Sequence, residues 1–506
     1  MSLSGAGFLA SRRDESPILP WLALFLILLC LIPPTGILSD NEEDYFALAA
    51  RAVAKEAPPS GTAVFDASPH RFFNEHLLGP LIREIGFERA QIITRFAAAL
   101  AYALVLRALF RCFAVSALDG ALIILVFASL GQTLMGGEWL FGDYEAKIPA
   151  YCLVIGGLAR LLRRRDLMQS ALLFALAAYF HFLVGIFWFV AAMALRMVQE
   201  PAEIRRLAGA SALFLAAIAP LLGTIAWSRL AMTAAGDPRF PSPDVIYSLI
   251  RAPHHAAPFL TIENFRVQWL PGFLLAGAML ASAIAIARAT ESPLLRHVAL
   301  WLGGLLAYLF MALVASFFDR HAGSLGKFYL FRPAALLLLL WLVLVAAYLD
   351  TLEIKRAPSL KLLALALLLP NFLLGTANRI AGEHAEAARR GADMAALGAY
   401  LARDAAPEDV VLVDPALEYA FLGIERRTGH PALVMWKFMP TNDRDILEWY
   451  RRIEFRRKLF ESGCAREPAY RVRFLLATPE HAAALSASCG PIVLEAGRFA
   501  LLRRTG

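Results

Sequence analysis

Four carboxylates lie within five residues, shortly after the first long apolar stretch of the chain. The segment reads SDNEEDYF from Ser39 to Phe46. Acids favour the first turn of a helix, where the backbone dipole is positive, but that preference explains one or two of them rather than four. Crowded like charges repel, so we expect an acceptor, a cation or a general-base role to account for them. The acids of this segment are Asp40, Glu42, Glu43 and Asp44.

A second acidic segment, GEWLFGDYEAK, runs from Gly137 to Lys147 and opens another apolar stretch. Asp143 and Glu145 stand at the expected helix start, and Lys147 follows at once. A lysine there opposes the helix dipole, which favours a specific anionic partner. The simpler alternative is dipole capping by the acids, with a lysine that extends its ammonium group to the lipid headgroups.

Cations and histidines gather in the later polar segments. Cations near the headgroup plane can hold a lipid phosphate or diphosphate, although they can also simply contact lipid. The adjacent histidines lack a third ligand at a suitable spacing, so we favour contact with a phosphate or sugar over zinc. A lone histidine between two apolar stretches is interpreted as structural, or as an edge of the same pocket. These residues are Arg251, His254 and His255, then Arg320, Lys327 and Arg332, and the lone His181.

Long apolar stretches must position these groups. Hydrophobic residues make up 59% of the 506-residue chain and charged residues only 18%, whereas soluble proteins have about 45–50% and about 25%. A helix needs about 20 mostly apolar residues to cross a bilayer. We expect a polytopic α-helical membrane protein with eleven spans, near residues 18–38, 90–111, 119–136, 147–162, 168–181, 183–198, 206–229, 268–288, 297–317, 331–349 and 359–377.

Arginine tracts orient these spans, because short basic loops stay in the cytoplasm. We attribute the net charge of +7 to this topology and see no basic, aromatic-rich face for nucleic acid. The orientation requires residues 168–198 to form a hairpin with its tip at His181, since a single tilted span would invert everything after it. The N-terminus is then cytoplasmic. The outer face receives segments 39–89, 137–146, 230–267 and 318–330 and the tail 378–506.

The tail changes character and predicts a small α/β domain outside the membrane. An amphipathic helix is expected over 382–403, and strands over 410–414, 470–477 and 491–502. Cys464 and Cys489 lie in this tail, and a disulfide between them is one possibility in an oxidising compartment. High alanine and arginine usage is typical of a GC-rich bacterium, so we expect the bacterial inner membrane with a periplasmic tail.

The combination resembles the GT-C superfamily of membrane glycosyltransferases, which includes oligosaccharyltransferase, protein mannosyltransferases and the aminoarabinose transferase of lipid A. Members carry an acidic motif directly after the first span, matched here from Asp40 to Tyr45. Many have a second acidic motif in the next outer loop, matched by Asp143-Tyr144-Glu145. Many also have a late outer arginine for the carrier phosphate, for which Arg332 or Arg320 is the candidate.

This resemblance implies inverting transfer of a sugar from a polyprenyl-phosphate donor to an envelope glycan, lipid or protein at the periplasmic face. It implies Asp40 or Glu43 as the base. The other acids, Glu42, Asp44, Asp143 and Glu145, would contact the acceptor or a metal. The donor phosphate would be held by Arg332, Lys327, Arg320, Arg251, His254, His255 and Lys147.

Several alternatives stay open. The acids allow Mg²⁺ or Mn²⁺ but do not require either ion. A transporter or flippase of lipid-linked substrates would need polar residues or helix breaks in mid-membrane, for which Pro220–Gly223 is a weak candidate. An O-antigen polymerase or ligase would depend on arginines in a large outer loop, and the first acidic cluster argues against it. A membrane scaffold would explain the tail but not the acids and cations.

Overall fold

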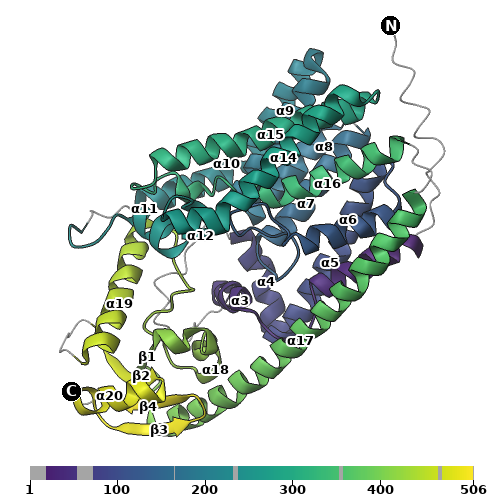
Figure 1. Cartoon of the computed structure of the whole chain (residues 1–506). Coiled ribbons are helices and arrows are strands. Elements are labelled where there is room, and N and C mark those ends of the chain that lie inside the picture. Colours follow the sequence, from purple (N-terminus) through teal and green to yellow (C-terminus); the bar gives the residue numbers. More distant parts are fainter. Residues whose placement is uncertain are drawn as a thin grey trace.

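A bundle of apolar helices forms most of the molecule, and a small mixed sheet lies at one end of it (Figure 1). The computed structural model describes residues 19–53, 72–164, 166–231, 237–352, 357–464 and 470–504. Seven helices of this described part are long and apolar enough to cross a membrane, and three shorter apolar helices accompany them. The expectation of a mostly helical, multi-span membrane protein is confirmed.

Each of the eleven expected spans coincides with a helix of the bundle. Two are shorter than expected. The first ends before Pro33, whose ring restricts the preceding residue and removes a backbone donor. The third ends before Gly131 and Gln132, which both have positive φ angles of 73° and 64°. The helices are α2 (Leu22–Leu31), α5 (Phe87–Cys112), α6 (Ala117–Ser129), α7 (Lys147–Arg164), α8 (Leu167–Phe180), α9 (Phe182–Gln199), α10 (Ile204–Ala231), α14 (Leu270–Ala289), α15 (Pro293–Phe318), α16 (Ala334–Thr351) and α17 (Ala357–Asp404).

The hairpin between α8 and α9 is present as the arginine pattern predicted. His181 is the single residue between the two helices and has extended backbone angles, φ −147° and ψ 100°. Beyond it, Gly185 packs so closely on α8 that an added Cβ would lie 2.3 Å from the backbone nitrogen of Ala178. The chain therefore reverses direction at His181, which supports the topology on which the outer face was assigned.

Short helices fill the polar segments between the long ones. The first acidic segment forms the opening turn of α3 (Asp40–Val53), which packs against α4 (Phe72–Ile85). Residues 243–269 form a series of short turns that includes two π-helical segments. This series comprises α11 (Pro243–Val245), η6 (Ile246–Arg251), α12 (Pro253–Ala256), α13 (Ile262–Asn264) and η7 (Phe265–Trp269). The remaining 3₁₀ turns are η2 (Leu19–Trp21), η5 (Pro201–Glu203), η8 (Gly326–Phe328) and η9 (Pro415–Ala420).

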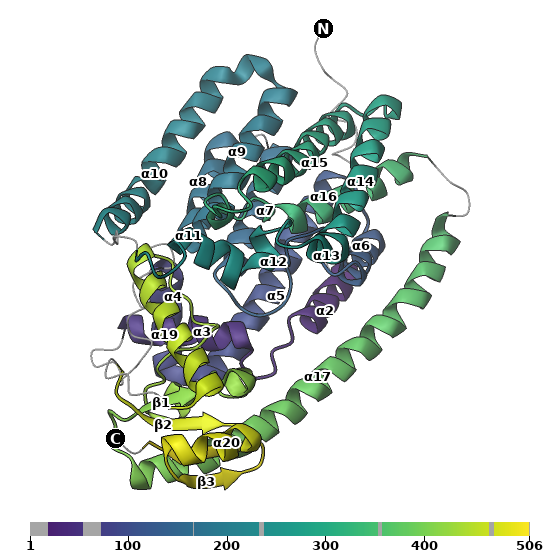
Figure 2. The ribbon, with the colours of Figure 1, turned by 60° about the vertical axis from the view of Figure 1, so that its left-hand side comes forward.

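Helix α17 runs unbroken along the edge of the molecule from the bundle to the tail (Figures 1 and 2). We expected a span ending near residue 377, at the proposed domain boundary, and a separate helix over 382–403. One continuous helix of 48 residues instead covers both segments. Proline is present at position 370, and no break in helical structure marks the boundary.

The tail holds a four-stranded sheet with strand order β1-β2-β4-β3. β1 (Val410–Val413) is parallel to β2 (Val472–Ala477), whereas β4 (Phe499–Arg503) is antiparallel to β2 and to β3 (Ile492–Ala496). One face of the sheet packs on α19 (Asp443–Ser462) and α20 (Pro479–Cys489). The other face packs on the end of α17 and on the segment that includes α18 (Ile424–Thr428). The structure joins Cys464 and Cys489 in a disulfide.

Candidate functional site

Two cavities meet where the bundle, the first acidic helix and the tail come together. The first cavity has a volume of about 700 Å³ and is lined by α3, the loop 137–147, the α8–α9 turn, the 243–256 turns, the segment 324–332 and the tail. The second cavity, of about 580 Å³, lies on the other side of α3, against α17 and the tail. Only Asn41, Tyr419 and Lys437 line both cavities among the described residues.

A buried carboxylate organises the wall of the first cavity. Glu138 is 2% exposed and lies 3.4 Å from the Arg332 guanidinium and 3.7 Å from the Lys147 ammonium. Burial alone would raise the pKa of Glu138, but the positive charges of Arg332 and Lys147 outweigh it and lower that pKa. Glu138 therefore holds two cations at the cavity as a charged carboxylate.

Arg332 is oriented from several sides. Its Nη1 donates to Nε2 of His181 at 2.8 Å, so that nitrogen of the histidine is the acceptor. Its guanidinium stacks over the Tyr329 ring, 4.5 Å from the centroid. The Arg332 Nε is buried without a hydrogen-bond partner in the described part of the chain. A buried guanidinium with a donor to spare suits an anionic oxygen.

Lys147 lies in the same wall, 3.5 Å from Glu145 and 3.7 Å from the centre of the Trp139 ring. Burial raises the pKa of Glu145; Lys147 lowers it, while Asp143 and Glu138 raise it further, and the net shift is upward. Because Glu145 becomes neutral more readily than an ordinary glutamate, it neutralises the charge of Lys147 less, and that charge can act on a ligand.

The histidine pair closes one side of the first cavity in its neutral form. Burial lowers the pKa of His254, with Arg251 adding to the effect, and burial lowers the pKa of His255 to about 3. Nδ1 of His255 contacts the carbonyl oxygen of Gly136. Gly137 has a φ of 61°, and an added Cβ there would lie 3.3 Å from the His254 ring. The glycines thus allow the second acidic loop to pass against the histidines.

The second cavity receives the acid that we expected to be the base. Asp40 begins α3 and lies 3.3 Å from Arg390 of α17. Burial raises the pKa of Asp40, and Arg390 only partly offsets this rise. Asp143 and Glu383 line the same cavity. A carboxylate with a raised pKa accepts a proton more readily than an ordinary aspartate, as a general base requires.

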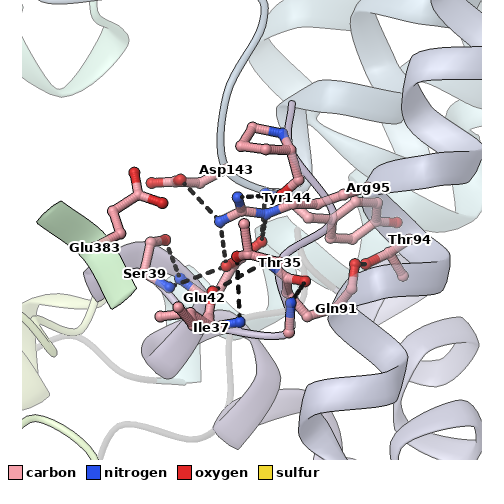
Figure 3. A network of polar contacts seen from close by, with 12 residues as sticks. Thr35, Ile37, Ser39, Glu42, Gln91, Thr94, Arg95, Asp143, Tyr144 and Glu383 are labelled. Atoms are coloured by element: carbon pink, nitrogen blue, oxygen red, sulfur yellow. Dashed lines mark hydrogen bonds and ion pairs between the residues drawn. The ribbon is translucent and has the colours of Figure 1, made fainter. Parts of the chain in front are cut away.

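A buried arginine ties the two acidic segments together (Figure 3). Arg95 of α5 binds Glu42 through Nε and Nη2, both at 2.7 Å, and its Nη2 also lies 3.1 Å from Asp143. Glu42 further accepts from the backbone nitrogens of Ser39 at 3.0 Å and Tyr144 at 2.9 Å. These contacts occupy both carboxylate oxygens of Glu42, so it positions the two segments and lines neither cavity.

The remaining predicted site residues differ in which cavity, if either, they line. Glu43 lines the second cavity but pairs with Arg426 at 2.6 Å. Arg320 lines neither cavity: its guanidinium lies over the Phe317 ring and donates to the Phe317 carbonyl at 2.8 Å. Asp44, Arg251 and Lys327 all line the first cavity.

The two cavities carry opposite charge among the described residues that line them. Five cationic side chains face three carboxylates in the first cavity, so its formal charge is +2. Four cationic side chains face six carboxylates in the second, so its formal charge is −2. An anionic ligand is therefore favoured in the first cavity and disfavoured in the second.

The described residues do not assemble a metal site. Within them, no group of three or more histidine, cysteine, aspartate or glutamate side chains is arranged to hold a metal ion. Of the acids expected to contact Mg²⁺ or Mn²⁺, Asp44 and Glu145 line the first cavity, Asp143 lines the second, and Glu42 lines neither.

Sequence reasoning did not assign three residues that the structure places here. Glu138 stands inside the second acidic segment, next to Trp139, and its position there was the available signal. Arg95 lies within an apolar span, where a charged residue is costly and so marks a specific role. Lys437 belongs to no cluster of charged residues in the sequence of the tail, and no local pattern distinguishes it from other lysines.

No protein-family model matches the sequence, and no curated protein matches it either. Among solved structures, the chain is similar to ArnT from Cupriavidus metallidurans. The apo structure aligns with a TM-score of 0.43 and 13% identity over 96% of this chain and 98% of that one. The structure of ArnT bound to undecaprenyl phosphate aligns with a TM-score of 0.42 and 13% identity, over 96% of this chain and 97% of that one.

Proposed function

We propose that the protein is an integral membrane glycosyltransferase of the GT-C type. It moves a sugar from a polyprenyl-phosphate donor to an envelope glycan, lipid or protein at the outer face of a bacterial inner membrane. The observation that carries the proposal is the pair of adjoining cavities with opposite charge, which meet beside the first acidic helix. A transferase needs two substrate sites in contact, one for an anionic donor and one for a nucleophile.

The first cavity suits the donor. Arg332 and Lys147 provide fixed positive charge for the phosphate, and Glu138 holds both in place. Neutral His254 and His255 add hydrogen-bonding groups without adding charge. Such preorganised cations stabilise the charge that develops on a departing phosphate. The lipid chain would lie along the apolar residues that line the same cavity at the α8–α9 turn and α10, which are Phe180, Phe182, Leu183 and Ile225.

The second cavity suits the acceptor, with Asp40 as the base. The acceptor oxygen or nitrogen attacks the anomeric carbon and gives its proton to the Asp40 carboxylate. The bond from the anomeric carbon to the phosphate oxygen breaks, and its electron pair leaves with the phosphate. Attack opposite the leaving group inverts the anomeric configuration. Asp40 is preferred over Glu43 because Glu43 is held in a short ion pair with Arg426.

The test uses purified protein with labelled polyprenyl-phosphate sugars and isolated envelope acceptors. We expect Asp40→Asn to abolish transfer while donor binding persists, because only the base is lost. Arg332→Ala should weaken donor binding about tenfold or more, since hydrogen bonds to charged groups contribute about 1.5–3 kcal/mol.

Matched controls are Asp404→Asn at the end of α17 and Arg320→Ala, because neither residue lines either of the two cavities of the site. Transfer that survives both Asp40→Asn and Arg332→Ala would contradict the proposal. Donor binding and translocation without transfer to any acceptor would identify a transporter instead.

A further inference from the structure

Lys437 of the tail lies at the junction of the two cavities. Of the three described residues that line both, it is the one with a charge. Its ammonium contacts the side-chain oxygen of Asn41, the residue after Asp40 on α3. The carboxylates of Glu145, Asp44 and Asp40 all act on it electrostatically, so the ammonium lies among acids of both acidic segments.

The backbone around Lys437 is held rigidly by residues outside its own turn. Its amide donates to Glu418 at 3.0 Å, and Glu418 is itself buried and paired with Arg456 at 2.6 Å. Arg251 donates to the carbonyl oxygens of Trp436 and Lys437 at 2.8 and 3.3 Å. The backbone from which the Lys437 side chain extends is therefore already ordered, which reduces the entropy lost when a ligand binds.

The cations that line the first cavity differ in whether a carboxylate contacts them directly. Lys147, Lys327 and Arg332 each have a carboxylate within 4 Å, and Arg251 donates to two backbone carbonyls instead. No carboxylate of the described chain lies within 4 Å of the Lys437 ammonium, although the residue is half-buried. The acids around Lys437 therefore act on it only at longer range, and an anionic ligand can make the direct ion pair that none of them makes.

We infer that Lys437 binds the donor phosphate at the point where the sugar passes from one cavity to the other. The inference rests on the proposed function. The phosphate oxygen that receives the electron pair of the broken sugar–phosphate bond then accepts a hydrogen bond from the Lys437 ammonium. The C-terminal domain is therefore part of the active site, and contributes more than a cover over it.

The experiment measures binding of a sugar-free polyprenyl phosphate in detergent micelles. We expect Lys437→Met to weaken binding about tenfold to a hundredfold, while Lys437→Arg keeps most of the affinity. Lys458→Met is the matched control, because Lys458 is an exposed lysine of the same domain on α19. The transfer assay should show a raised KM for the donor in Lys437→Met.

A pH series separates ligand binding from a merely structural role. Burial and, to a lesser extent, Arg251 lower the pKa of Lys437, so its charge is lost at a lower pH than that of an ordinary lysine. Phosphate binding by the wild type should fall as the pH rises through that lowered pKa. Lys437→Arg should continue to bind at higher pH. This comparison remains valid even if Lys437→Met folds poorly.

The outcomes distinguish the inference from the function on which it rests. If Arg332→Ala weakens phosphate binding but Lys437→Met binds like the wild type, the inference is wrong and the proposed function stands. The same holds if the alkaline limb of binding does not move in Lys437→Arg. If the wild type binds no polyprenyl phosphate, both fail together.

Discussion

Glu138 is the residue on which the first cavity depends most. It is almost fully buried and lies near two cations, Arg332 and Lys147. Lys147 also has Glu145 nearby, whereas Glu138 is the carboxylate that pairs with Arg332. Losing one partner of a buried ion pair leaves an uncompensated charge, which costs far more than losing a surface pair.

We predict that Glu138→Gln lowers the stability of the protein by roughly 3 kcal/mol, because buried Arg332 would lose its carboxylate partner and Lys147 would keep only Glu145. Thermal unfolding in detergent measures the effect. Glu291→Gln, in the exposed connection between α14 and α15, is the control and should leave the midpoint unchanged. An equal midpoint for wild type and Glu138→Gln would contradict this account of the cavity wall.

Comparing the wild type with Glu138→Gln at different pH values tests whether Glu138 is charged. Its folded pKa lies below the ordinary value of 4.5, so its contribution to stability is present above pH 4.5. That contribution is lost as the pH falls from 4.5 through the lowered pKa. The difference in unfolding midpoint between wild type and Glu138→Gln should therefore shrink over this acidic range.

At the scale of elements, the Arg95–Glu42 pair connects a membrane helix to both acidic segments. Arg95 comes from α5, Glu42 from α3, and the Asp143 and Tyr144 contacts from the loop before α7. This buried ion pair therefore helps to set the relative placement of the two cavities.

We predict a coupling energy of about 2–3 kcal/mol between Arg95 and Glu42, because a buried bidentate pair with shared partners is strongly non-additive. The measurement is a double-mutant cycle of Arg95→Met, Glu42→Gln and both together, followed by unfolding in detergent. Arg83 and Glu84, an exposed pair on α4, provide the control cycle with a coupling near zero. Equal coupling in both cycles would show that the buried pair has no special role.

The sequence predicted those elements well that are marked by residues close together in the chain. Arginines at both ends of residues 168–198 predicted the hairpin at His181, and the strands of the tail lie close to the expected ranges. The continuity of α17 was missed, because an apolar segment followed by an amphipathic one gives no sign of whether the helix breaks between them. The π-helical turns at 246–251 and 265–269 also left no recognisable pattern.

The site was only partly predictable for a related reason. The sequence placed acids and cations on one face, and most of them do line one of the two cavities. It could not show that Glu42 and Glu43 are occupied by Arg95 and Arg426, because these partners lie 53 and 383 residues away. Charge pairing across such separations depends on packing, which no local pattern records.

Transfer to envelope acceptors requires the tail and both cavities to lie on the periplasmic side of the membrane. The arginine tracts and the hairpin at His181 support this orientation. Figures 1 and 2 show the tail sheet at one end of the bundle, next to α3 and α19.

We predict that a cysteine at Glu480, exposed on α20, reacts with a membrane-impermeant maleimide in intact spheroplasts. A cysteine at Glu291, exposed between α14 and α15, should react only after the membrane is permeabilised. The reverse pattern would place the tail in the cytoplasm and remove the proposed access to envelope acceptors. The wild type, with Cys464 and Cys489 in a disulfide, measures background labelling.

The contact between Lys437 and Asn41 joins residues 396 positions apart in the chain. Contacts of such long sequence separation form slowly, because closing a long loop costs conformational entropy before the contact is made. During synthesis, α3 leaves the ribosome long before residue 437 is made, and in the proposed orientation the tail crosses the membrane before it folds. If the proposed function holds, the site is complete only after the tail has folded against α3, and a chain without a folded tail would be inactive.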